Sequence, residues 1–382
     1  MNCRNLLLMR KNTALTTFEI LGWDIGGIDR GYPQYSPDPH LGTKEEFKKA
    51  LADIRAIGVH PLIFTNIQFA DTATPLFRNE LSRYAVEGRW APDWAIYGFG
   101  ENTASARIGL ARSNATFVSP SHPKFREFLL KQYAELVEDG ADGFQLDKTN
   151  ITGALDFNPR LQVSPDKSLI CGVISTFQEL LRTARKINPE FSIASETMAD
   201  RTLPYIDVSY MRMGRIDMDP AYRYTFPEWT GTIFGESPGD FTPMNNGMRY
   251  GLVWALAPRH YNDSIDEPLT RPLARYVQEL IRIRTQYQDL LFLGRFNDTI
   301  GATVTGNLDI RYSVFTSLQP ADKRKACVVV NFGDKDEVAA VTFDGPANQE
   351  VEICAPFEPN RKDVLPIRLN IPPHRCVVLV SQ

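Results

Sequence analysis

Two acidic residues, Asp147 and Glu196, have the types and positions best suited to chemistry in this chain. Each follows a short apolar run that predicts a buried strand, Ala141–Leu146 and Phe191–Ser195. In (β/α) barrels, the carboxyl ends of the parallel strands meet at the rim that carries the active site. Neighbouring strands lie about 4.8 Å apart, so the two carboxyl groups can approach the roughly 5–5.5 Å at which one carboxylate attacks a sugar carbon and the other protonates the leaving oxygen.

Each carboxylate also has a purely structural interpretation. Asp147 directly precedes Lys148, and the two can form a buried ion pair within the barrel. Glu196 can cap a helical turn near Met198. We favour the catalytic interpretation because two acids end successive predicted strands and aromatic residues occur in the flanking loops.

Other polar residues near predicted strand ends are candidate substrate contacts. Asp24 and Lys148 are expected to hydrogen-bond the hydroxyls of one sugar ring, and Asn66 and Arg212 to act in the same way. Trp23 has two interpretations of equal weight, stacking on a sugar ring or packing in the core. No residue cluster has metal-ligand spacing, so we expect neither a metal nor a cofactor.

The elements that must position these residues alternate between strand and helix. Thr43, followed by Glu46, is expected to cap a helix that ends near Ile57. A second helix is predicted before the strand that leads to Asp147, and a third between Asp147 and Glu196. The predicted strands and helices are, in chain order, Phe18–Trp23, 43–57, Val59–Asn66, Phe125–Val137, Ala141–Leu146, Leu169–Ile187, Phe191–Ser195, Ile206–Met211 and Leu273–Tyr287.

This alternation predicts an α/β fold, a (β/α)8 TIM-type barrel over residues 1–292. Six or seven of its strands can be counted, and a further one is expected within residues 1–17 or 228–248. A long insertion at about 67–120, which contains Trp90 and Trp94, is expected to form a lid or cleft wall. Residues 293–382 change to strand-like alternation and predict a small C-terminal antiparallel β-sandwich. Its predicted strands are Asp309–Thr316, Lys325–Asn331, Glu337–Phe343, Glu350–Cys354 and Arg375–Val380.

Composition excludes several other classes of protein. The chain has 382 residues, 43% hydrophobic and 23% charged, with a net charge of −4, so it lacks the basic character of a nucleic-acid-binding protein. No stretch is apolar enough to span a membrane. The five cysteines form no CxxC pair, which favours reduced thiols and a cytoplasmic location. The oligomeric state is open, a homo-oligomer included.

Two longer runs resemble a known group of enzymes. Residues 32–66 (YPQYSPDPHLGTKEEFKKALADIRAIGVHPLIFTN) and 122–148 (HPKFREFLLKQYAELVEDGADGFQLDK) are similar to the α-amylase superfamily and the related α-galactosidase-like barrels. The resemblance implies that Asp147 is the nucleophile and Glu196 the acid/base. Where the α-amylase pattern has an arginine, two residues before the nucleophile, this chain has Gln145, a further candidate substrate contact. Candidates for a third carboxylate are Asp217, Asp219, Asp263 and Asp266.

The sequence therefore predicts a retaining glycoside hydrolase that releases a terminal galactose or glucose from a carbohydrate substrate. Two kinds of alternative stay open. One is a different enzyme on the same scaffold: a β-galactosidase, an inverting enzyme or a transglycosylating enzyme. The other is a carbohydrate-binding barrel without catalytic activity.

Overall fold

The computed structural model describes residues 16–28, 30–90, 115–149, 155–213, 219–257, 265, 267–346 and 348–381; for 211–213 it describes the strand but not the side chains. These residues form two compact units, the first from residue 16 to Tyr210 and the second from Met211 to residue 381. Each unit has a hydrophobic core of its own.

Parallel strands in chain order form the centre of the first unit. Their order is β1 (Thr17–Ile20), β2 (His60–Asn66), β5 (Gly143–Asp147), β6 (Ser192–Ser195) and β7, which begins in this unit and spans Val208–Met213. The hydroxyl of Tyr210 on β7 donates to the carboxylate of Glu19 on β1. The sheet is therefore curved enough for side chains of these separated strands to meet, as in a barrel.

Helix α2 (Lys44–Ala56) begins as the sequence predicts. The hydroxyl of Thr43 accepts a hydrogen bond from the backbone N–H of Glu46, while the Glu46 carboxylate accepts one from the backbone N–H of Thr43. This reciprocal capping box satisfies donors that the first turn of a helix leaves free. The helix buries Leu51 and Ile54, and Leu51 belongs to the core of the first unit.

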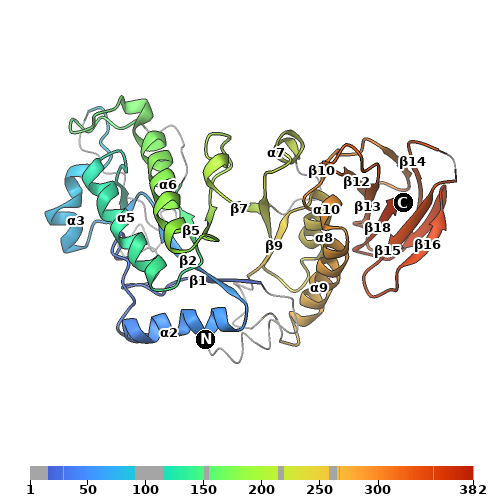
Figure 1. The fold of residues 1–382 in the computed structure, drawn as a ribbon, viewed down its shortest axis with the longest axis horizontal. Helices are drawn as coiled ribbons and strands as arrows, with labels where there is room; N and C mark the ends of the chain where they lie inside the picture. The colour runs from blue at the N-terminus through green and yellow to red at the C-terminus, as the bar shows by residue number, and fades with distance from the viewer. Residues whose placement is uncertain are drawn as a thin grey trace. The chain divides into compact units, whose positions relative to one another are not determined.

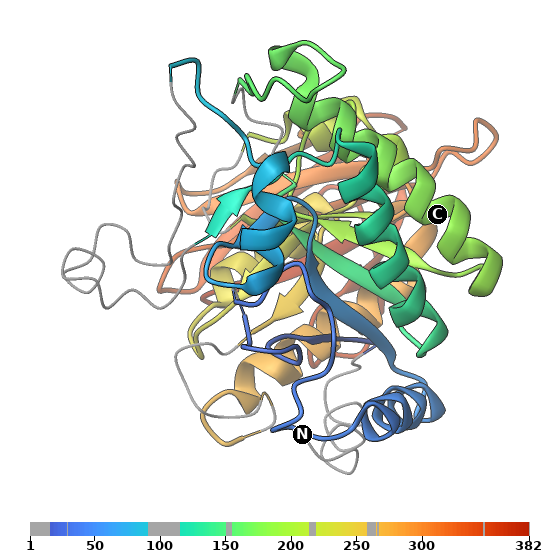
Figure 2. The ribbon, with the colours of Figure 1, turned by 90° about the vertical axis from the view of Figure 1, so that its left-hand side faces the viewer.

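Helices α5 (Pro123–Glu138) and α6 (Ser168–Ile187) lie side by side against the sheet (Figures 1 and 2). Their apolar faces join the core that also contains Phe144 of β5 and Ile193 of β6. Gly172 of α6 lies so close to the chain before α5 that an added Cβ would be 2.4 Å from the backbone nitrogen of Ser121. The close approach of α6 therefore depends on a residue without a side chain.

Short elements follow β2 where the sequence predicts a long insertion. Strands β3 (Phe69–Asp71) and β4 (Ala115–Phe117) pair antiparallel. The insertion also contains α3 (Pro75–Asn79) and η1 (Leu81–Tyr84). Two further short elements lie elsewhere, η2 (Pro165–Lys167) after β5 and η3 (Leu203–Tyr205) after β6. Trp90 is 88% exposed, and Trp94 lies outside the described residues.

The second unit begins with another helix and parallel-strand segment. Strand β8 pairs in parallel with β9 and lies within residues 228–248, one of the two places where a further strand was predicted. The elements are α7 (Ala221–Thr225), β8 (Gly231–Gly235), α8 (Phe241–Tyr250), β9 (Val253–Leu256), α9 (Arg271–Gln286) and α10 (Gln288–Leu291).

Two antiparallel sheets end the chain and share one apolar core. One has the order β10-β12-β13-β18-β15-β16 and the other the order β11-β14-β17, which is the predicted sandwich (Figure 1). The bounds are β10 (Arg295–Phe296), β11 (Ala302–Thr305), β12 (Ile310–Thr316), β13 (Lys325–Asn331), β14 (Glu337–Phe343), β15 (Glu350–Cys354), β16 (Arg361–Val364), β17 (Ile367–Ile371) and β18 (Arg375–Ser381). The sequence did not predict β10, β11, β16 and β17.

The predicted fold class, a (β/α) barrel followed by an antiparallel β domain, is confirmed, with seven parallel strands in the part of the chain that the structure describes. Some predicted strand ends are wrong. Strand β1 ends at Ile20, three residues before Trp23, and Arg212 lies inside β7 rather than after it. Asp147 is the last residue of β5 rather than the first residue beyond the strand.

Candidate active site at the strand ends of the first unit

The ends of β2, β5 and β6 bring three polar residues into one row. Asn66 is the register partner of Asp147, and Leu146 is the partner of Ser195, the residue before Glu196. The backbone N–H of Glu196 donates to the carbonyl of Leu146 at 3.2 Å, which continues the ladder past the last strand residue. Asp147 and Glu196 therefore occupy adjacent positions at the ends of neighbouring parallel strands, about 4.8 Å apart along the sheet.

Asp147 is 4% exposed, and its carboxylate accepts two hydrogen bonds from Lys148. The backbone N–H of Lys148 lies 2.6 Å from Oδ1, and the ammonium lies 2.6 Å from Oδ2. The ion pair that the sequence admitted as an alternative is thus present. The ammonium of Lys148 is engaged by the carboxylate, which differs from the predicted role of this lysine as a ligand of sugar hydroxyls.

Glu196 is half-buried and lies beyond the end of β6. The predicted helical turn near Met198 is absent, because the next helical element is η3, so the structural interpretation of Glu196 as a helix cap is wrong. Next to Glu196, the hydroxyl of Ser195 donates to the hydroxyl of Thr149 at 2.9 Å, which ties β6 to the segment after β5.

Asn66 and Gln145 place two fully buried amides near Asp147. The backbone carbonyl of Asn66 accepts hydrogen bonds from the hydroxyls of Tyr35 at 2.6 Å and Tyr133 at 2.8 Å. The side-chain Nδ2 of Asn66 has no partner among the described residues. Within the same ranges, Gln145 has no partner for either polar atom of its amide. It projects from the same face of β5 as Asp147, one residue pair deeper. Unpaired buried amides are costly, so these atoms are suited to hold water or a polar ligand group.

Trp23 and Asp24, which follow β1 in the chain, are also buried. The indole of Trp23 is 4% exposed, stacks on Phe47 with ring centroids 5.0 Å apart, and donates to the carbonyl of Phe64 at 3.0 Å. This is core packing, and we leave Trp23 out of the proposed substrate contacts. Asp24 is 1% exposed. Burial raises the pKa of the Tyr35 hydroxyl well above its ordinary value, and the charge of Asp24 contributes to the same increase.

The remaining predicted residues fall into two groups. The side chain of Arg212 lies outside the described residues, as do Asp217, Asp263 and Asp266. Asp219 is exposed, and its Oδ1 accepts a hydrogen bond from the backbone N–H of Ala221 at 3.0 Å, two residues further along the chain. Of the four candidates for a third carboxylate, Asp219 is the one that the structure describes.

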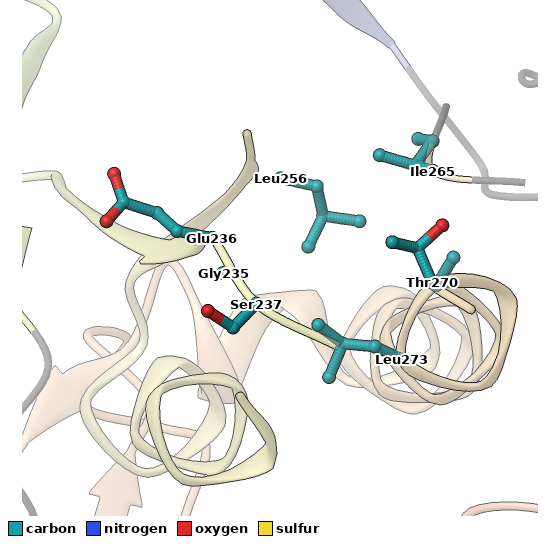
Figure 3. A pocket seen from close by; sticks show the side chains of 8 residues that line it. Gly235, Glu236, Ser237, Leu256, Ile265, Thr270 and Leu273 are labelled. Atoms are coloured by element: carbon teal, nitrogen blue, oxygen red, sulfur yellow. The ribbon is translucent and has the colours of Figure 1, made fainter. Parts of the chain in front are cut away.

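Sequence reasoning missed Glu236, an acidic residue that directly follows β8 in the second unit. It borders a hollow of about 240 Å³, open solvent included, lined mainly by apolar side chains such as Leu256 and Leu273. Figure 3 shows its carboxylate directed away from these two leucines. The backbone N–H groups of Glu236 and Ser237 both donate to Asp240 at 2.7 Å, which fixes the turn. The run GTIFGE has the pattern of the other two acids, a short apolar stretch followed by an acidic residue. Glycines at both ends of the strand made the strand hard to predict from sequence.

Metal sites and membrane-spanning helices are two other features considered for the described residues. No group of three or more His, Cys, Asp or Glu side chains is arranged to hold a metal ion within the ranges that the structure describes. Among the helices in those ranges, none has the length and apolar character required to cross a membrane.

Comparison with known proteins gives a structural likeness alone. No family model matches the sequence, and no curated protein matches it. The fold is similar to that of trehalose-6-phosphate hydrolase (TreA) from Bacillus licheniformis, with a TM-score of 0.67 and 11% identity over 100% of this chain and 95% of that one. It is also similar to a noncanonic maltogenic α-amylase, AmyB, from Thermotoga neapolitana, with a TM-score of 0.64 and 12% identity over 99% of this chain and 94% of that one. A third similar structure is an α-amylase from Geobacillus thermoleovorans complexed with acarbose. Its TM-score is 0.64 and its identity is 12%, over 99% of this chain and 91% of that one. At these identities the likeness establishes the fold, which resembles that of α-amylase-type enzymes.

Proposed function

We propose that this chain is a retaining glycoside hydrolase that releases a terminal hexose, with Asp147 as the nucleophile and Glu196 as the acid/base. The observation that carries the proposal is the register of β5 and β6, which places these two acids at adjacent strand ends. Support for the sugar-cleaving class comes from the fold, which glycoside-cleaving enzymes share.

The proposed reaction has two displacements. A carboxylate oxygen of Asp147 attacks the anomeric carbon as the bond to the leaving oxygen breaks, and Glu196 gives that oxygen its proton. Glu196, now a carboxylate, then takes a proton from water, whose oxygen attacks the same carbon and frees Asp147. The sugar leaves with its original anomeric configuration, and both carboxyl groups return to their starting protonation states.

The sugar itself is a finer part of the proposal. The similar structures are named as α-amylases and as a trehalose-6-phosphate hydrolase, so we propose α-glucosides as the first substrates to test and α-galactosides as the second. Asn66, Gln145 and Asp24 are the proposed polar contacts of the sugar, with Arg212 as a further one. Neither a metal nor a cofactor takes part in the proposed steps.

The proposed organisation of the chain is a catalytic barrel over residues 1–292 and a sandwich over 293–382. Its support is the change from the parallel strand β9 to the antiparallel strand β10. We also propose a cytoplasmic location. Cys171, Cys327, Cys354 and Cys376 are free thiols, which suits a reducing compartment.

The experiment is a panel of nitrophenyl α- and β-glycosides, tested with the full chain and with Asp147→Asn and Glu196→Gln variants. We expect turnover of at least one α-hexoside and a loss on the order of 10⁴-fold in kcat for Asp147→Asn. Asp53→Asn is the matched control, because Asp53 also pairs with a lysine at 2.6 Å but lies on the exposed surface of α2. An NMR spectrum of the first product formed identifies its anomer. An inverted anomer contradicts the proposed mechanism, and full activity in both site variants contradicts the assignment.

The Asp147–Lys148 ion pair favours one rival, a carbohydrate-binding barrel without activity. This rival predicts that no glycoside in the panel is cleaved and that Asp147→Ala binds sugar as tightly as the unmodified chain. Calorimetric titration with maltose and galactose measures that affinity. Cleavage that disappears in both site variants eliminates the rival.

A further inference from the structure

We propose that Lys148 is a positioning residue that holds the carboxylate of Asp147 in the orientation required for attack. The inference rests on the proposed function and replaces the predicted role of Lys148 in binding sugar hydroxyls. It follows from how this lysine contacts Asp147 and from how the lysine itself is held.

Lys148 binds both oxygens of the carboxylate that precedes it. Its backbone N–H serves Oδ1 and its ammonium serves Oδ2, each at 2.6 Å. The residue has a φ of +53°, in the left-handed region that side chains with a Cβ rarely adopt. Uncommon backbone conformations of this kind are concentrated at functional sites, where the surrounding structure maintains them. Two donors from one residue therefore leave the carboxylate little rotational freedom.

Neighbouring segments hold Lys148 in place independently of Asp147. The side-chain amide of Gln68 donates to the Lys148 carbonyl, and the ammonium lies 5.6 Å from the ring centroid of Phe69. On the other side, Thr149 accepts the hydrogen bond from Ser195 of β6. The segment that carries the lysine is thus fixed to β6 on one side and to the chain after β2 on the other, which lets it act as a rigid support for the carboxylate.

The charge beside Asp147 comes from Lys148 rather than from the barrel interior. Gln145, two residues before Asp147 on the same strand face, is neutral, and the one ion pair of Asp147 among the described residues is with Lys148. The side chain of Lys148 is only 20% exposed, so water screens this pair incompletely. A carboxylate oxygen that accepts one hydrogen bond keeps a lone pair for attack.

The test compares Lys148→Met and Lys148→Arg in the enzyme with its best aryl glycoside. Methionine keeps the length of the side chain without its charge, whereas arginine keeps the charge. We expect kcat to fall about 100-fold in Lys148→Met with KM within a factor of about two, because small displacements of a reacting group have effects of this size. Lys148→Arg should recover at least a tenth of the original kcat. Lys49→Met is the control, since Lys49 also pairs with an aspartate at 2.6 Å but on the exposed side of α2.

Each result separates the two proposals. A raised KM with unchanged kcat returns Lys148 to the role of a substrate ligand and overturns the positioning role. An unchanged kcat in correctly folded Lys148→Met, measured per active site by single-turnover kinetics, also overturns that role while the proposed function stands. If the unmodified enzyme cleaves no glycoside in the panel, the proposed function fails and the positioning role fails with it.

Discussion

Arg223 offers the sharpest test of how the second unit is held together. It is 2% exposed and lies in α7, and its guanidinium donates to four backbone carbonyls. These carbonyls belong to Pro227, Tyr250, Phe292 and Gly294, which lie at chain bends and at the end of α8. Carbonyls at helix ends and bends have no partner in regular structure, and one side chain satisfies all four.

The magnitude of the effect follows from these contacts. Replacing Arg223 with methionine preserves most of the buried stem but leaves four carbonyls without this donor, and each lost bond costs about 1–1.5 kcal/mol. The gain is smaller: burial lowers the pKa of Arg223 to about 10, so the native state carries a desolvation cost that the variant avoids. We expect a net loss of about 3–5 kcal/mol in the free energy of unfolding of the second unit. A lysine at this position is not equivalent, because an ammonium has three donors and lacks the planar shape of a guanidinium. The free energy of unfolding of Arg223→Lys should therefore lie between those of the unmodified chain and Arg223→Met.

Urea unfolding followed by the fluorescence of Trp229 and Trp254 measures this loss within the second unit. The control is Arg275→Met, because Arg275 lies on α9 and is exposed. We expect less than about 0.5 kcal/mol for the control, as is usual for surface substitutions. A loss below about 1 kcal/mol in Arg223→Met would refute the reasoning, since it would mean that water satisfies the carbonyls as well as the guanidinium does.

Two further predictions concern packing and pH. Gly172→Ala should lower the free energy of unfolding of the first unit by about 1–3 kcal/mol, because the new Cβ would lie 2.4 Å from the Ser121 backbone nitrogen, which cannot rotate away. Thermal unfolding measures this loss. An unchanged midpoint temperature would contradict the close packing of α6. Burial raises the pKa of Cys376 to about 12 and of Cys354 to about 11, and it raises the pKa of Cys327 as well. The stabilisation from these neutral thiols should be complete below about pH 8.5, where unfolded cysteines begin to ionise, and should be lost progressively as the pH rises toward the native pKa values. The urea concentration at the unfolding midpoint should therefore decrease as the pH is raised from about 8 to about 10.5, and it should decrease less in Cys327→Ala. An equal decrease in the variant and in the unmodified chain would show that this thiol does not contribute.

Local patterns were sufficient to predict most elements near the site. The capping box at Thr43 was predicted and is present, because it depends on residues three apart in sequence. The strands that carry Asp147 and Glu196 were predicted because buried parallel strands are continuous apolar runs. Strand β8 was placed only within a broad range, since glycines at both of its ends weaken the apolar signal.

Side-chain environment could not be predicted in the same way. Trp23 was equally suited to a sugar ring or to the core, and the choice depended on Phe47 and Phe64, which are distant in sequence. The sequence allowed Lys148 to pair with Asp147 or to bind substrate. The structure shows the pairing, in a left-handed backbone conformation that no local pattern indicated.

The sequence alone determined the order of strands and helices, the barrel-type fold and the acids that end two successive strands, because hydrophobic periodicity and capping act over a few residues. Tertiary structure decided the register that aligns Asn66 with Asp147 and the burial of Gln145 and Asp147. These depend on segments that fold together from distant parts of the chain, and burial and hydrogen bonding take effect only after those segments have met.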